Sequence, residues 1–236
     1  MEPTLIVGFA EMELGYIWRQ ATPEAKAIII FLVCFSVLAW SIIASKAIQM
    51  KRGKKLNRLF SEAYQKQNNV LQIYNNNIEV DGCPLYTVYR QGCQILDSRL
   101  KSNPHSRNGY ISLKSMEHVK RALEAAVAQE ALKLESGLIF LAIAVSGAPF
   151  LGLLGTVWGV MSTFAHVGMA GEATLTAMAP GVAAALITTV AGLLVAIPSM
   201  FGYNWLVHNL RVMTVELDNF AQDLASKMEA EYLKDE

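Results

Sequence analysis

Residues 136–207 constrain the fold most, because this long stretch carries a single charged side chain, that of Glu172. Soluble domains contain about 25% charged residues, whereas this chain contains 17%, together with 53% hydrophobic residues. The stretch is too long for one membrane span, which needs about 20 residues. Gly168 and Gly171 beside Glu172 predict a break in it. We therefore expect two transmembrane helices joined by a short turn: residues 136–166, 167–174 and 175–207.

A further apolar run at residues 27–45 contains no charge and is long enough to cross a membrane. The preceding Thr22, Pro23 and Glu24 are typical of a helix start. A secretory signal peptide is the alternative, but the acidic start of the chain lacks the basic region that such peptides have. The sequence thus predicts an all-α membrane protein with three transmembrane helices and long helical cytoplasmic extensions.

Basic residues next to the spans predict the orientation, because Lys and Arg accumulate in cytoplasmic loops. Six of them follow the first span directly: Lys46, Lys51, Arg52, Lys54, Lys55 and Arg58. The 167–174 turn has none. We expect residues 46–135 and 208–236 in the cytoplasm, and residues 1–26 and 167–174 in the periplasm, with a periplasmic N-terminus and a cytoplasmic C-terminus.

The same basic cluster could instead bind anionic membrane lipid or nucleic acid. Its position directly beside a span favours a role in topology. The equal numbers of basic and acidic residues, 20 of each, argue against nucleic acid as a partner.

Helical periodicity continues outside the spans. We expect helices over Leu56–Ile78 and Leu85–Leu100, and a third that runs from Leu113 into the membrane. The tail beyond Arg211 is expected to continue the last span. Apolar residues in 1–26 are compatible with an amphipathic helix along the outer membrane surface.

Motifs for enzyme chemistry are absent from the sequence. No phosphate-binding loop is present, and Cys34, Cys83 and Cys93 lack metal-ligand spacing. His166 lies at the outer end of its span, where a lone histidine is ordinarily solvated. A proton pump needs an ionisable group at depth, so this chain either performs no such chemistry or receives the group from a partner. We predict no metal, no cofactor and no enzymatic activity.

Small and hydroxyl residues recur on one face of each of the two later spans. They are Gly152, Thr156, Gly159 and Thr163 in one, and Gly181, Ala185, Thr188 and Gly192 in the other. Such a face can pack against a neighbouring helix, or it can line a polar path. The two uses are compatible on different sides of one helix.

Two segments of these spans resemble the signature of the ExbB/TolQ family, which is related to the flagellar stator protein MotA. They are Gly-Leu-Leu-Gly-Thr-Val-Trp-Gly-Val-Met at 152–161 and Ala-Pro-Gly-Val-Ala-Ala-Ala-Leu-Ile-Thr-Thr at 179–189, followed by 192–198 and Tyr203-Asn204.

The resemblance implies a subunit of a bacterial inner-membrane motor. It implies a homopentameric ring around two copies of an ExbD/TolR-like single-span partner, whose membrane Asp carries the proton. A TonB/TolA-like protein would transmit the motion to the outer membrane. Ton, Tol, gliding and secretion systems all share this signature.

Residue by residue, the resemblance makes Thr156 and Thr189 the pore-lining threonines. It assigns signature or helix-packing positions to Gly152, Gly155, Gly159, Pro180, Gly181 and Gly192. Ala184 stands where many relatives have Glu, so the proton carrier is expected to lie wholly on the partner. The missing Glu also leaves an alternative, a passive oligomeric scaffold that stabilises a partner without conducting protons.

Overall fold

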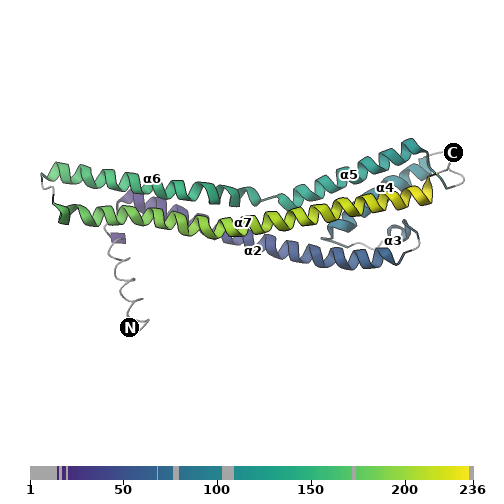
Figure 1. The fold of residues 1–236 in the computed structure, drawn as a ribbon, viewed down its shortest axis with the longest axis horizontal. Coiled ribbons are helices and arrows are strands. Elements are labelled where there is room, and N and C mark those ends of the chain that lie inside the picture. The colour runs from purple at the N-terminus through teal and green to yellow at the C-terminus, as the bar shows by residue number, and fades with distance from the viewer. Residues whose placement is uncertain are drawn as a thin grey trace, which may run out of the picture. The chain divides into compact units, whose positions relative to one another are not determined.

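A computed structural model describes residues 15, 18–19, 21–67, 69–76, 80–102, 109–171 and 174–233. Figure 1 shows its helices, which are α2 (Pro23–Gln65), α3 (Gln72–Asn75), α4 (Pro84–Ser102), α5 (Leu113–Glu135), α6 (Leu138–Ala170) and α7 (Leu175–Tyr232). In the described part of the chain the only β-type pairing is an isolated bridge between Ile111 and Leu233. The prediction of an all-helical chain is confirmed.

The chain forms two compact units. The apolar unit contains the described residues of 1–44 and 137–204, and the polar unit contains those of 45–136 and 205–236. The helices α2, α6 and α7 are long and apolar enough to cross a membrane. This agrees with the three spans expected from the sequence.

The start of α2 follows the predicted capping pattern. The hydroxyl of Thr22 accepts a hydrogen bond from the backbone N–H of Ala25 at 3.3 Å, and Pro23 is the first helical residue. Most of the residues expected to form an amphipathic helix within 1–26 lie outside the described part of the chain.

The predicted helix over Leu56–Ile78 is wrong. Residues from Leu56 onward continue α2, which ends at Gln65, and the short α3 follows only at Gln72. The reason lies in Asn69, whose side-chain oxygen accepts the backbone N–H of Leu71 at 2.8 Å. Such a local side-chain bond competes with helical hydrogen bonds and favours a turn.

The helix predicted to run from Leu113 into the membrane is also interrupted. Helix α5 ends at Glu135, and Gly137 has a φ of 84°, a left-handed conformation that favours glycine. Lys46 caps the end of α5 by donating from Nζ to the carbonyl of Leu134 at 3.2 Å and to Ser136 Oγ at 3.3 Å. Burial lowers the pKa of the Lys46 ammonium.

The turn between α6 and α7 is shorter than the 167–174 turn expected from the sequence, because residues 167–170 are still helical. Helix α6 ends at Ala170 and is followed by Gly171 with a φ of 69°. The hydroxyl of Thr174 accepts the backbone N–H of Ala177 at 3.3 Å at the start of α7. The tail prediction is confirmed, because α7 continues to Tyr232 with Pro180 and Pro198 inside it.

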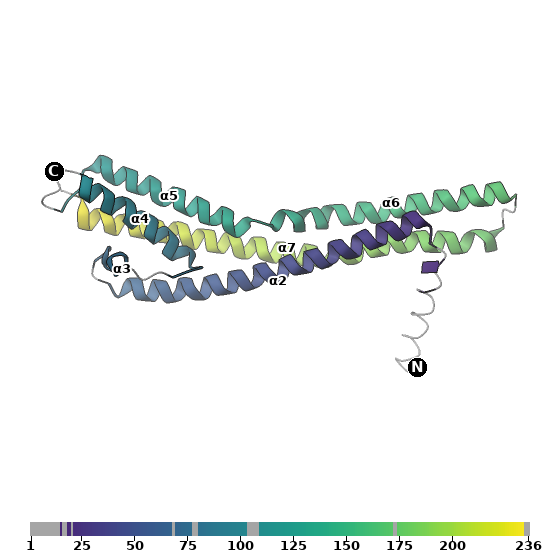
Figure 2. The same cartoon turned by 180° about the vertical axis from the view of Figure 1, so that it is seen from behind.

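Within the apolar unit, α2 packs on both α6 and α7, as the view from behind in Figure 2 illustrates. Leu32 of α2 is fully buried against Ala148 of α6 and Val195 of α7. Near the end of the apolar unit, a β-carbon at Gly202 would lie 2.5 Å from the side chain of Ile43. A small residue such as Gly202 thus allows α2 to pack closely against α7.

The polar unit has a core of aromatic side chains. Phe60 of α2 makes ring contacts with Tyr64, Tyr86, Tyr89 and Phe220, at centroid separations of 5.5 to 6.3 Å. The hydroxyl of Tyr89 donates to the carbonyl of Val70 at 2.6 Å. These contacts join α2, α4 and α7 around one apolar centre.

Both cysteines of the polar unit belong to its interior. Cys83 and Cys93 are fully buried, and burial raises the pKa of Cys93 to about 12. The Cys83 thiol donates to Oδ1 of the buried Asn57 at 3.5 Å, and the same oxygen accepts the backbone N–H of Leu85 at 3.2 Å. Both thiols are therefore part of the packed interior of the polar unit.

Phe60→Ala should destabilise the polar unit by roughly 3–5 kcal/mol, the usual cost of removing a buried aromatic ring. Leu59→Ala is the matched control, since Leu59 is the neighbouring residue and 54% exposed. Thermal unfolding followed by circular dichroism should show a lower midpoint for the Phe60 variant alone. Equal midpoints for the two variants would contradict this account of the core.

Candidate functional site

Glycines of α6 bring the backbone of α7 into direct contact. A β-carbon at Gly152 would lie 2.8 Å from the carbonyl oxygen of Thr188, and one at Gly159 would lie 2.7 Å from the β-carbon of Ala185. On α7, a β-carbon at Gly192 would lie 2.6 Å from the carbonyl oxygen of Ala148. The predicted small-residue faces therefore pack against each other within one chain.

Three threonine hydroxyls converge on the carbonyl oxygen of Gly152. The Oγ1 atoms of Thr156 and Thr188 each lie 3.0 Å from it and that of Thr189 lies 3.2 Å from it, so each hydroxyl is within donating distance. Thr156 and Thr189 are also hydrogen-bonded to each other through their hydroxyls. We refer to Thr156, Thr188 and Thr189 as the hydroxyl cluster.

Gly155 provides the space for this cluster. A β-carbon at Gly155 would lie 2.6 Å from Oγ1 of Thr188, so any side chain there would displace that hydroxyl. Thr188 is fully buried, whereas Thr156 and Thr189 are only partly buried. Within the cluster, Thr188 is therefore enclosed, whereas Thr156 and Thr189 are partly accessible at the surface of the chain.

The structure brings together Thr156 and Thr189, the two threonines that the family resemblance singles out. Thr188 was not predicted as a member of the site. A signal for it existed, because Thr188 lies on the same small-residue face of the span as Gly181 and Gly192. Its contact with Gly155 depends on how α6 and α7 pair, which periodicity alone does not specify.

Pro180 lies inside α7, and the neighbouring Gly181 faces Thr163. A β-carbon at Gly181 would lie 2.4 Å from Oγ1 of Thr163. Ala184 is buried against Ala21, which precedes α2, and against Ala25 in the first turn of α2. The position that the family resemblance associates with Glu is thus packed among small side chains here.

Ionisable groups are scarce around the cluster. Between residues 138 and 207 the sequence has Glu172 as its single acidic or basic residue, apart from His166. His166 is exposed and its Nδ1 lies 2.8 Å from the carbonyl oxygen of Ser162. A hydroxyl donates and accepts hydrogen bonds, but it does not titrate near neutral pH, so the cluster can guide a proton without storing one.

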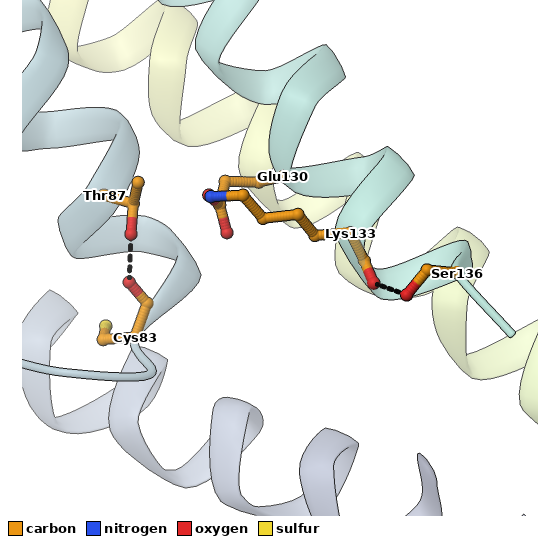
Figure 3. Close-up of polar contacts among 5 residues, drawn as sticks. All are labelled: Cys83, Thr87, Glu130, Lys133 and Ser136. Carbon is orange, nitrogen blue, oxygen red and sulfur yellow. Dashed lines mark hydrogen bonds and ion pairs between the residues drawn. The ribbon is translucent and has the colours of Figure 1, made fainter. Parts of the chain in front are cut away.

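The polar unit contains a separate cavity of about 560 Å³ between α2, α4 and α5. Figure 3 shows part of its lining, in which Thr87 donates to the carbonyl of Cys83 at 3.2 Å. The buried carboxylate of Glu130 is paired with Lys133 at 2.6 Å. Among the described residues, no three His, Cys, Asp or Glu side chains are grouped as metal ligands would be.

Comparison with known proteins shows the family to which the chain belongs. The sequence profile described as "MotA/TolQ/ExbB proton channel family" matches residues 91–219, a range that includes the hydroxyl cluster and its glycines. The chain belongs to this family. It is a TolQ/ExbB-like subunit of a proton-driven membrane motor of the Tol or Ton type, and proteins of this family are channel and motor subunits rather than enzymes.

Relatives in the MotA/TolQ/ExbB family match most of the chain. The Tol-Pal system protein TolQ of Pseudomonas aeruginosa is 36% identical over 207 residues, which is 86% of each chain. TolQ of Haemophilus influenzae is 32% identical over 92% of this chain and 94% of its own. The biopolymer transport protein ExbB of Neisseria meningitidis is 25% identical over 90% of this chain and 96% of its own.

Gly152→Ala should separate α6 from α7, because the added methyl would meet backbone atoms that cannot rotate away. Overpacking of this kind costs about 1–3 kcal/mol. Gly147→Ala is the control on the same helix, since the nearest atom to a β-carbon there is 3.9 Å away. Thermal unfolding in detergent should show a lower midpoint for Gly152→Ala and an unchanged or higher one for Gly147→Ala. Equal midpoints would contradict the close contact.

Proposed function

We propose that this chain forms a homopentameric ring around an ExbD/TolR-like single-span partner in a bacterial inner membrane, and that Thr156 and Thr189 line the path of the proton. Membership of the MotA/TolQ/ExbB family supports a proton-driven role. The observation that carries the site assignment is the pair of hydrogen-bonded, partly buried hydroxyls of Thr156 and Thr189. A membrane Asp on the partner would take up and release the proton beside them.

The charged and uncharged groups of the two proteins determine which one carries the proton and which one guides it. A proton that crosses a potential of about 100 mV releases about 2.3 kcal/mol, and a group must change its protonation state to use that energy. The apolar parts of α6 and α7 offer hydroxyls but no carboxylate. A carboxylic acid on a partner can donate to these hydroxyls when protonated and accept from them when ionised.

The proposed orientation has residues 46–135 and 208–236 in the cytoplasm, and residues 1–26 and 167–174 in the periplasm. The basic residues from Lys46 to Arg58 support it through the positive-inside rule. Many large apolar side chains of the apolar unit are exposed, such as Phe31, Trp40, Phe150 and Leu194. Membrane lipid and neighbouring copies of the chain would cover them.

The relatives support a Tol- or Ton-type system. Their names refer to the Tol-Pal system and to biopolymer transport. We propose that the partner complex passes its motion to a TolA- or TonB-like protein and so acts on outer-membrane transport or envelope integrity. The identity of the single-span partner decides between the two systems.

Native mass spectrometry of the complex, purified through this chain from its own cells, should find five copies with two copies of a small single-span protein. That protein should carry an Asp in its span, and its sequence would name the system. A ring without a partner, or a partner with no titratable residue in its span, would contradict proton conduction and favour the passive scaffold.

Thr156→Val and Thr189→Val should each lower proton flux through the reconstituted complex by roughly tenfold or more, because hydrogen bonds to a charged group contribute about 1.5–3 kcal/mol. Flux is measured in liposomes with a pH-sensitive dye under an imposed potential. Val keeps the branched shape of Thr, so the complex should still assemble.

Thr163→Val is the matched control for both variants. Thr163 lies in α6 and is partly buried, and its hydroxyl donates to the carbonyl of Gly159 at 2.8 Å, away from the hydroxyl cluster. Its flux should equal that of the unmodified complex. Unchanged flux in a Thr156→Val and Thr189→Val double variant would overturn the path assignment.

A further inference from the structure

The carbonyl oxygen of Gly152 has more donors around it than it can accept. Thr156 lies four residues further along the same α-helix, so its backbone N–H takes one acceptor site. The hydroxyls of Thr156, Thr188 and Thr189 lie at 3.0, 3.0 and 3.2 Å from the same oxygen. A carbonyl oxygen has two lone pairs, so the three hydroxyls share about one remaining position.

Thr188 is the member with a second acceptor of its own. Its Oγ1 lies 2.7 Å from the carbonyl oxygen of Ala185, one turn earlier in α7. Its contact with Thr156 Oγ1 is 3.4 Å, which is longer than an ordinary O–H···O bond. The Thr188 hydroxyl can therefore donate to either of two carbonyl oxygens, that of Ala185 or that of Gly152.

These two positions leave Thr156 and Thr189 in different states. When Thr188 donates to the carbonyl oxygen of Ala185, one hydroxyl of the Thr156–Thr189 pair donates to the carbonyl oxygen of Gly152. The other hydroxyl of the pair donates to the first. Both protons are then used, so the pair offers only lone pairs to its surroundings. When Thr188 donates to Gly152, that acceptor is occupied. One hydroxyl of the pair then donates to the other, whose proton is left to point outward.

We propose that Thr188 is a positioning residue that sets whether the Thr156–Thr189 pair presents only lone pairs or an outward-pointing hydroxyl proton to its surroundings. The first arrangement suits a protonated carboxylic acid, which needs an acceptor, and the second suits a carboxylate, which needs a donor. Thr188 is fully buried within the chain, so it acts through the pair rather than by touching the acid. This inference rests on the proposed function and adds a third residue to its site.

Two substitutions at Thr188 separate its hydroxyl from its shape. Thr188→Val keeps the branched side chain and removes the hydroxyl, while Thr188→Ser keeps the hydroxyl and removes the methyl group. In the reconstituted complex, Thr188→Val should lower proton flux by roughly three- to tenfold, as the loss of one neutral hydrogen bond would. Thr188→Ser should retain the flux of the unmodified complex.

A purely structural role predicts the opposite order. The γ-methyl of Thr188 packs closely on Gly155, where a β-carbon would lie 3.1 Å from it. If only packing mattered, Val would preserve flux and Ser would lose it. That result, or full flux in both variants, would overturn the proposal.

Parallel measurements keep the proposal distinct from the function on which it rests. If Thr156→Val and Thr189→Val lose flux but Thr188→Val does not, Thr188 has no positioning role and the path assignment stands. If all three retain flux, the path assignment itself fails. Should the Val complex not assemble, Thr188→Ala replaces it; Ala must then fall below Ser in flux for the proposal to hold, and equal flux would overturn it.

Discussion

Backbone contact between α6 and α7 is the interaction on which the apolar unit depends. Lipid is as apolar as leucine, so helices in a membrane gain little by hiding apolar side chains from it. They associate through close packing and hydrogen bonds instead. Gly152 and Gly192 make that packing possible, because each stands where a β-carbon would collide with backbone atoms of the other helix.

The same contact creates the candidate site. Hydroxyls on two helices can share one carbonyl oxygen only if the helices touch, and the absent side chain of Gly155 leaves room for Thr188 between them. The result is a polar cluster within a stretch of sequence, residues 138–207, whose single charged side chain is that of Glu172. In the function that we propose, a chain built in this way guides a proton that a partner carries.

The polar unit is held together by a different physical effect. Its core is a cluster of aromatic rings from α2, α4 and α7, which the hydrophobic effect stabilises in water. Its ion pairs lie largely at the surface, for example Lys227 with Asp223 at 2.9 Å, and pairs of this kind contribute little. Helices α2 and α7 contribute residues to both units, so each helix changes from an apolar to an amphipathic surface along its length.

Local chemistry in the sequence indicated the three long apolar helices and the break between the last two. The lack of charge between 136 and 207, the glycines near Glu172 and the Thr22-Pro23 start are signals that act over a few residues or along one helix. The predicted helices failed at Asn69 and at Gly137, where a side-chain hydrogen bond and a left-handed backbone interrupt otherwise helical patterns. The periodicity of apolar residues does not reveal such effects of single residues.

By itself, the sequence determined the all-helical class, the three long apolar helices and the family signature that contains Thr156 and Thr189. Only the tertiary structure decided which residues meet across α6 and α7. Periodicity specifies a face of each helix but not the register between two faces. That register places Thr188 beside Gly155 and gives three hydroxyls one carbonyl oxygen to share.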